Sequence, residues 1–268
     1  MSMKPIGLAA AVWLALGAAP QDPLVRARQL YNEHQYEAAA VAAREASRVP
    51  ELADVAAVVL ARAHLECYRA SGEAADLLAA RQALAAADSR RLAPRDRHDL
   101  LVGYGELLYF DGHYGAAAEM FGAALSSAGQ AAPADRDLVL DWWAAALDRE
   151  AQLTTGADRE RLYRRVIDRM EPAAEADPPS AAALYWLAAA AAGAGDAGRA
   201  WHAAVSGWIR APLAAGPRAT LRADLERLVQ QAIIPLRARL PTAGGDARQA
   251  AAAMQRDWEA VKEIGIRR

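Results

Sequence analysis

The sequence predicts an all-α fold, a solenoid of about five helical hairpins closed by C-terminal capping helices. Three observations support this class. Alanine makes up roughly a quarter of the 268 residues and β-branched residues are sparse, which favours helix and close helix packing. Apolar residues recur at helical spacing over most of the chain. Finally, the helical patterns occur in pairs, and a short polar or glycine-containing turn separates the two members of each pair.

The clearest pair lies between Leu101 and Leu125, around a turn at residues 111–113. Small residues occupy the positions where paired helices must approach closely: Gly105, Ala117 and Ala124. Large residues that would fill the space between the helices are Leu101, Tyr104, Leu108, Tyr114 and Phe121. This pattern resembles the tetratricopeptide repeat (TPR), in which W-x2-L-G-x2-Y is followed by A-x3-F. The resemblance implies a right-handed solenoid that serves as an interaction surface, with a concave groove lined by the first helix of each hairpin.

Two hairpins are predicted before this one. The first covers residues 23–47 and has small and large residues at the corresponding positions, and Pro50 follows it. The second covers residues 51–92, where Ser71-Gly72 marks the turn. Tyr36 and Tyr114 are too far apart for two repeats of 34 residues, so the second hairpin should have longer helices or an insertion.

Two further hairpins are predicted after Pro133. The fourth has helices at residues 135–152 and 157–176, and it is degenerate because it lacks the alanine and aromatic spacing. The fifth covers residues 180–212 and recovers that spacing. Its tryptophans, Trp186, Trp201 and Trp208, are expected to fill volume between neighbouring repeats that the alanines leave open.

Residues 216–268 are predicted to form a terminal cap, since a solenoid must cover the apolar face of its last repeat. The first capping helix carries an apolar stripe, and Pro235 should end or kink it. After a break at residues 241–245, a final helix should turn Met254, Trp258 and Val261 inward. The repeat array itself is assigned to residues 20–215.

Residues 1–19 have the form of a secretory signal peptide, with a short basic start, an apolar run at residues 5–16 and small residues after it. The cleavage site is ambiguous among Gly17, Ala18 and Ala19. We therefore expect an exported, periplasmic protein, or alternatively one anchored in the membrane by an uncleaved leader. Arginine greatly outnumbers lysine, which indicates a GC-rich bacterial genome. The single cysteine, Cys67, excludes an intrachain disulfide and lies too far from the leader to carry a lipid.

Several function classes find no support in the sequence. The formal net charge is -2 and the acidic and basic residues are interspersed, so binding to nucleic acid is not predicted. The histidines have no metal-ligand spacing, and residues 193–198 lack the Lys-Ser or Lys-Thr of a phosphate loop. Asp137, Asp141 and Asp148 fit a solvated acidic stripe better than a catalytic pair. Thus we predict neither an enzyme nor a cofactor or metal site.

The candidate binding residues are mainly aromatic. Adjacent helical residues point about 100 degrees apart, so Tyr109-Phe110 and Trp142-Trp143 should not all be core, although they could also fill gaps between repeats. With the groove positions that the resemblance implies, the predicted partner-binding residues are Tyr31, Glu106, Tyr109, Phe110, Trp142, Trp143 and Tyr185. We expect a non-enzymatic scaffold or adaptor of the cell envelope that binds a polypeptide. The alternative is a periplasmic binding protein for a small apolar or aromatic ligand in a pocket walled by tryptophans.

Overall fold

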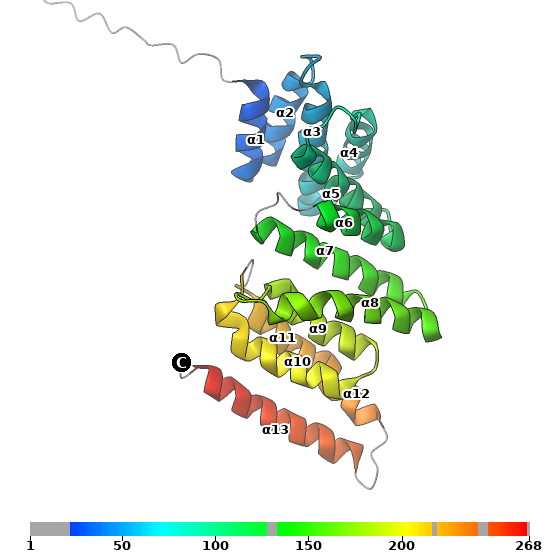
Figure 1. The fold of residues 1–268 in the computed structure, drawn as a ribbon, viewed down its shortest axis with the longest axis vertical. Coiled ribbons are helices and arrows are strands. Elements are labelled where there is room, and N and C mark those ends of the chain that lie inside the picture. The colour runs from blue at the N-terminus through cyan, green and yellow to red at the C-terminus, as the bar shows by residue number, and fades with distance from the viewer. Residues whose placement is uncertain (1–21, 128–132, 216–218, 241–245, 267–268) are drawn as a thin grey trace, which may run out of the picture.

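The computed structural model describes residues 22–127, 133–215, 219–240 and 246–266, and its regular elements are all helices (Figure 1). The predicted leader at residues 1–19 and the break at residues 241–245 lie outside these ranges. No helix in the described part of the chain has both the length and the apolar character that a membrane span requires. The all-α class predicted from the sequence is confirmed.

The helices follow one another in antiparallel pairs joined by short turns. The pairs are α1 (Pro23–Asn32) with α2 (Tyr36–Ala46), α3 (Ala53–Ser71) with α4 (Ala74–Ala86), α5 (Pro94–Phe110) with α6 (Tyr114–Ser127), α7 (Pro133–Gln152) with α8 (Gly156–Glu175), and α9 (Ala181–Gly193) with α10 (Ala197–Arg210). The turns at Gly72 and Gly112 have φ values of 74° and 80°, a region that favours glycine. At the equivalent place in the first pair, His34 has a φ of 60°.

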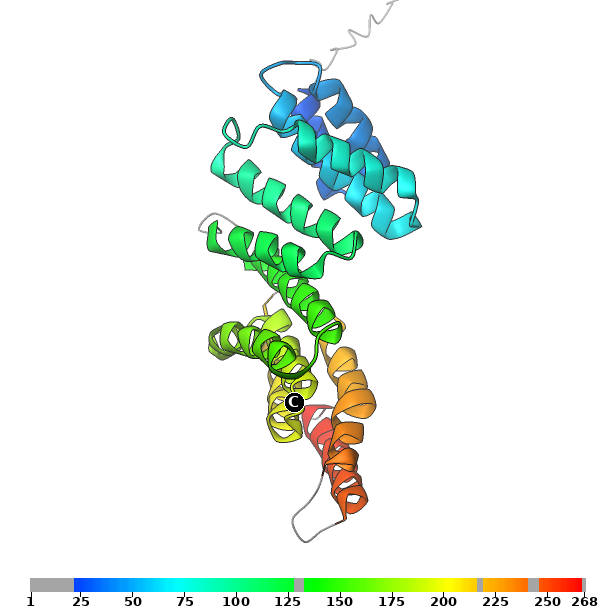
Figure 2. The same ribbon diagram turned by 90° about the vertical axis from the view of Figure 1, so that its right-hand side faces the viewer.

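The pairs stack in chain order into an elongated molecule (Figures 1 and 2). Besides its own partner, each first helix packs against the first helix of the next pair, so that α1, α3, α5, α7 and α9 form one continuous layer. This layer positions the candidate site. Side chains that face the same way on α1, α3, α5 and α7 are brought together, although they are far apart in the sequence.

The third pair shows why small residues are needed between its helices. Ala117 and Ala124 on α6 are completely buried, and so is Phe121 between them. The Phe121 ring lies so close to α5 that a Cβ atom placed on Gly105 would be 2.6 Å from its Cε1 atom. The prediction of close approach at these positions is confirmed. The helix α5 begins seven residues before Leu101, at Pro94, a residue whose fixed φ suits the first turn of a helix.

The C-terminal helices pack along α10, as Figure 2 shows. The first capping helix does not end at Pro235. Helix α11 (Leu221–Leu228) continues through a π-helical turn (Val229–Ile233) into α12 (Ile234–Arg239). The wider turn relieves the clash between the proline ring and the carbonyl four residues before it, so the chain stays helical.

The last helix, α13 (Ala247–Ile266), buries its apolar stripe as predicted. Trp258 is completely buried, and its ring centre lies 6.0 Å from that of Trp201 and 5.2 Å from that of Trp208. Met254 and Val261 pack against the same core. These tryptophans therefore fill the space between the fifth pair and the cap.

Candidate functional site

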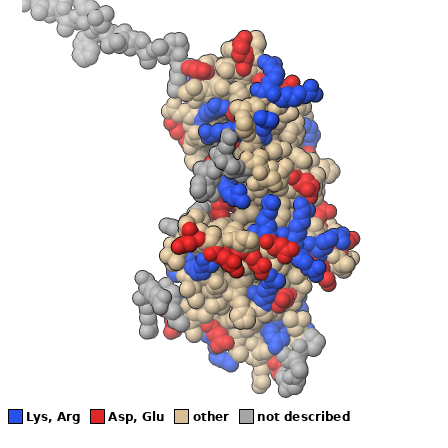
Figure 3. All heavy atoms as spheres, viewed as in Figure 1, with Lys and Arg blue, Asp and Glu red and all other residues tan. Residues whose placement is uncertain are grey.

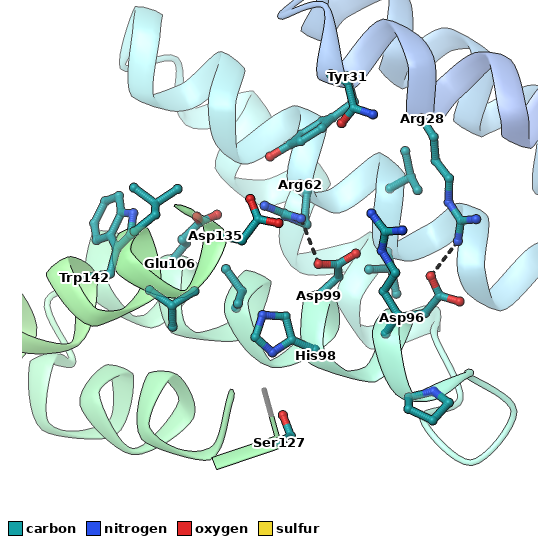
Figure 4. A pocket seen from close by; sticks show the side chains of 18 residues that line it. Arg28, Tyr31, Arg62, Asp96, His98, Asp99, Glu106, Ser127, Asp135 and Trp142 are labelled. Atoms are coloured by element: carbon teal, nitrogen blue, oxygen red, sulfur yellow. Dashed lines mark hydrogen bonds and ion pairs between the residues drawn. The ribbon is translucent and has the colours of Figure 1, made fainter. Parts of the chain in front are cut away.

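A pocket of about 440 Å³ lies across the layer of first helices (Figure 4). Helix α5 lines it with Asp99, Val102 and Glu106, whose spacing of three and four residues puts them on one helical face. The first helices α1, α3 and α7 also contribute lining residues. These include Arg28 and Tyr31 from α1, Arg62 from α3, and Asp135 and Trp142 from α7. We call this pocket the groove. Its charged and aromatic side chains point toward one another from four helices.

Two ion pairs join helices that line the groove, one between α1 and α5 and one between α3 and α5. The Arg28 Nη2 atom is 2.5 Å from Asp96 Oδ1, and Arg62 Nη1 donates to Asp99 Oδ1 at 3.0 Å. The Arg62 guanidinium also lies over the Tyr31 ring, 5.0 Å from its centre. Burial raises the pKa of the Tyr31 hydroxyl, although the positive charge of Arg62 acts in the opposite direction. These contacts connect α1, α3 and α5 on the surface that faces the groove.

Glu106 is the most deeply buried charged residue of the groove. The residue is only 4% exposed, its carboxylate oxygens keep contact with the water of the groove, and within the described residues it forms no hydrogen bond or ion pair. Burial raises the pKa of its carboxyl to about 7, while the nearby Arg62 charge lowers it and Glu66 raises it further. Asp135 lines the same groove and is exposed. A buried carboxylate without a donor is costly, because the water that it loses is not replaced.

At one end, the groove meets a cluster of aromatic rings. The ring centre of Trp142 is 5.1 Å from that of Tyr109 and 5.9 Å from that of Phe110, and it stacks on Phe121 at 5.9 Å. Tyr109 and Phe110 are both half-buried and do not line the groove themselves. Both rings pack against Trp142 of the fourth pair, and Phe110 also contacts Tyr68 of the second pair, with 5.0 Å between the ring centres.

The predicted binding residues thus lie in different parts of the structure. Tyr31, Glu106 and Trp142 line the groove together. Trp143 must be removed from the set, because α7 turns it into the core, where it is 2% exposed and lies 4.8 Å from the Arg169 guanidinium. Tyr185 lies in a different pocket of about 350 Å³, together with Asp137, Asp141 and Asp224.

The aspartates of α7 form the predicted solvated stripe only in part, because Asp141 is exposed but Asp148 is half-buried and Asp137 is buried. Asp137 is buried and accepts hydrogen bonds from the Ser180 hydroxyl and, at 3.3 Å, from the Ala182 amide. Asp141 accepts a 2.6 Å hydrogen bond from Trp186 Nε1. Asp148 accepts one of 3.0 Å from the Tyr163 hydroxyl. Each carboxylate therefore links the two helices of the fourth pair or links this pair to the fifth.

Charged side chains elsewhere on the surface are mixed in sign. On the face shown in Figure 3, basic and acidic residues are interspersed. Helix α8 is rich in arginine, yet Arg161 pairs with Asp158 at 2.6 Å and Arg165 with Glu119 at 2.8 Å. Among the described residues, no three His, Cys, Asp or Glu side chains are grouped so that they could hold a metal ion.

Apart from Glu106, the charged residues of the groove were not predicted from the sequence. Arg28, Arg62, Asp99 and Asp135 all occur on predicted helices, but a charged residue on a helix is usually solvated, and α3 carries no repeat signature. A usable signal was available at Arg62, which shares a helical face with Val58 and Val59 on the first helix of its pair. No family model, curated protein or solved structure is significantly similar to this chain.

Proposed function

We propose that this protein is a TPR-like scaffold or adaptor of the bacterial cell envelope, which binds a segment of a polypeptide partner in the groove. The proposal includes a right-handed solenoid of about five repeats, export through the leader at residues 1–19, and no catalytic activity. Location in the periplasm follows from the leader, and the partner is a protein or peptide. We do not propose nucleic acid as a partner. Contact with the membrane is proposed only through proximity or through an uncleaved leader.

The observation that carries the proposal is the groove itself. It crosses four consecutive first helices and combines ion-pairing groups with the half-buried rings of Tyr31 and Trp142. Aromatic side chains with charged neighbours are frequent at the energetic centres of protein interfaces. An elongated groove of about 440 Å³ fits a short stretch of extended chain whose backbone and side chains both need polar partners.

A pocket for a small apolar ligand has less support. Such a site would be walled by tryptophans, but Trp143, Trp208 and Trp258 are buried against other side chains of the core. Trp142 is the one tryptophan among the described residues that line the groove, and charged side chains line it on α1, α3, α5 and α7.

Site-specific photocrosslinking tests the proposal. Leu138 on α7 lines the groove and is 41% exposed, so a photoreactive amino acid at this position faces the expected partner. The matched control is Leu153, which is 70% exposed in the turn after the same helix and does not line the groove. We expect an envelope extract of the source to give a protein adduct at position 138 that is absent at position 153.

The crosslinked segment can then be identified by mass spectrometry and synthesised. As a free peptide it should bind the purified protein and compete with crosslinking at position 138. Equal adducts at both positions, or no protein adduct at position 138 from an extract in which the protein is folded and abundant, would refute the groove assignment. An adduct of a small molecule would support the alternative instead.

A further inference from the structure

We infer that the groove recognises a basic side chain, lysine or arginine, of the polypeptide partner, and that Glu106 is its principal acceptor. This inference rests on the proposed function and specifies the chemistry of the partner. It arises from the balance of charges inside the groove and from the position of Glu106, a largely buried carboxylate that faces the groove and has no protein donor among the described residues.

The charges of the groove do not cancel along its length. Each of the pairs Arg28–Asp96 and Arg62–Asp99 has no net charge and joins two helices. Glu106 and Asp135 remain, and neither forms an ion pair with another residue of the described chain. Among the described residues that line the groove, the remaining arginine is Arg95, which is exposed. It precedes Glu106 by eleven residues of α5, or about 16 Å along the helix axis.

An additional cation would therefore bind most strongly next to Glu106. It is 4% exposed, so that a charge brought to it is screened little by water. Arg62 is near enough to interact electrostatically but is already paired with Asp99, and it makes no hydrogen bond to Glu106. A guest ammonium or guanidinium group would supply the missing donors.

The walls beside Glu106 also suit a long basic side chain. Figure 4 shows Trp142 at the same end of the groove as Glu106, with Asp135 entering from α7. Lysine and arginine combine an apolar stem with a charged tip, and an indole ring attracts both. An acidic side chain would be repelled by Glu106 and Asp135, and an apolar one would leave the Glu106 carboxylate buried without a donor.

Peptide selection on the purified full chain tests this inference. Random decapeptides displayed on phage are selected on the immobilised protein, with crosslinking at Leu138 used to confirm that they occupy the groove. The selected peptides are synthesised with their basic residue intact or replaced by norleucine, which keeps the stem and removes the charge. Their affinities are measured for the unaltered protein, for Glu106→Gln and for the control Asp96→Asn, in which the carboxylate that is lost already has Arg28 as its partner.

The expected result is a shared lysine or arginine whose replacement by norleucine weakens binding to the unaltered protein at least tenfold, as charge coupling at an interface predicts. The same replacement should weaken binding to Glu106→Gln less than about twofold and should keep its tenfold effect in Asp96→Asn. Groove-binding peptides without a shared basic residue, or an equal norleucine effect in Glu106→Gln, would overturn the inference but leave the proposed function intact. If no selected peptide occupies the groove, both are refuted.

Circular dichroism of Glu106→Gln shows whether that variant is folded. If it is not, Asp135→Asn at an exposed position replaces it. In that variant the norleucine effect should fall by about threefold, in line with a partly solvated charge. An unchanged effect there would overturn the inference.

Discussion

Replacing Glu106 by Gln should stabilise the unliganded protein, and the gain should grow with pH. The carboxyl has an ordinary pKa of 4.5, and burial raises it to about 7 in the folded protein. Between these values the folded state binds more protons than the unfolded state, so the stability of the unaltered protein falls as the pH rises. Glutamine has a similar shape and no charge, so the variant avoids this loss.

The size of the effect follows from the two pKa values. Each pKa unit corresponds to about 1.36 kcal/mol, so the rise from 4.5 to about 7 amounts to about 3 kcal/mol once the carboxyl is fully ionised. The difference in free energy of unfolding between Glu106→Gln and the unaltered protein should therefore increase by about 3 kcal/mol from pH 4 to pH 8. Other buried carboxylates titrate alike in both proteins and cancel from this difference.

Urea denaturation followed by circular dichroism at a series of pH values measures this difference. Asp135→Asn removes an exposed carboxylate from the same groove, and its stability should stay within about 0.5 kcal/mol of the unaltered protein over the range. A difference for Glu106→Gln that does not change with pH would show that Glu106 is solvated or paired in solution. Glu106 would then not be a largely buried carboxylate without a donor.

Four further substitutions test the packing. Gly105→Ala places a methyl group 2.6 Å from the buried Phe121 ring and should lower the free energy of unfolding by about 1–2 kcal/mol. Gly122→Ala, with 3.5 Å to its nearest neighbour, should raise it by about 0.5–1 kcal/mol. Equal effects of the two substitutions in urea denaturation would contradict the close approach of α5 and α6. Asp137→Ala removes an acceptor that α9 needs and should cost about 1–3 kcal/mol, and a loss below about 0.5 kcal/mol would show that the contact has no structural role. Trp258→Ala should cost about 3–5 kcal/mol and increase hydrogen exchange in α13 first, so uniform exchange would argue against a docked cap.

The helices were predictable because their signals are local. Ser71-Gly72 and Gly112 mark turns whose backbone geometry depends on a few neighbouring residues, whereas the start of α5 at Pro94 was not predicted. The inward direction of Trp258 follows from helical periodicity within α13 alone. The close approach at Gly105 was visible because the small residue and its large partner both belong to the best hairpin.

The residues that line the groove are brought together by contacts between segments that are far apart in the sequence. These contacts cannot be inferred from a single sequence. Arg62 and Asp99 are 37 residues apart, and they meet because of the register between α3 and α5. The same limit applies to Trp142 and Trp143. Their 100-degree separation predicts that one faces inward, but only the packing of α7 against its neighbours decides that it is Trp143.

The core is unevenly distributed, and this has a consequence for how the groove behaves. One continuous apolar core extends from α5 to α13, whereas α1 and α2 are held by small, separate clusters built mostly from alanine. Segments with few buried apolar contacts open at a lower free energy than the rest of a protein. The wall that carries Arg28 and Tyr31 is therefore expected to open at a lower free energy than the wall that carries Trp142, which packs against the continuous core. A bound peptide that contacts both walls would slow amide exchange in α1 and α2 more than in α7, and part of its binding free energy would go into ordering the N-terminal pair.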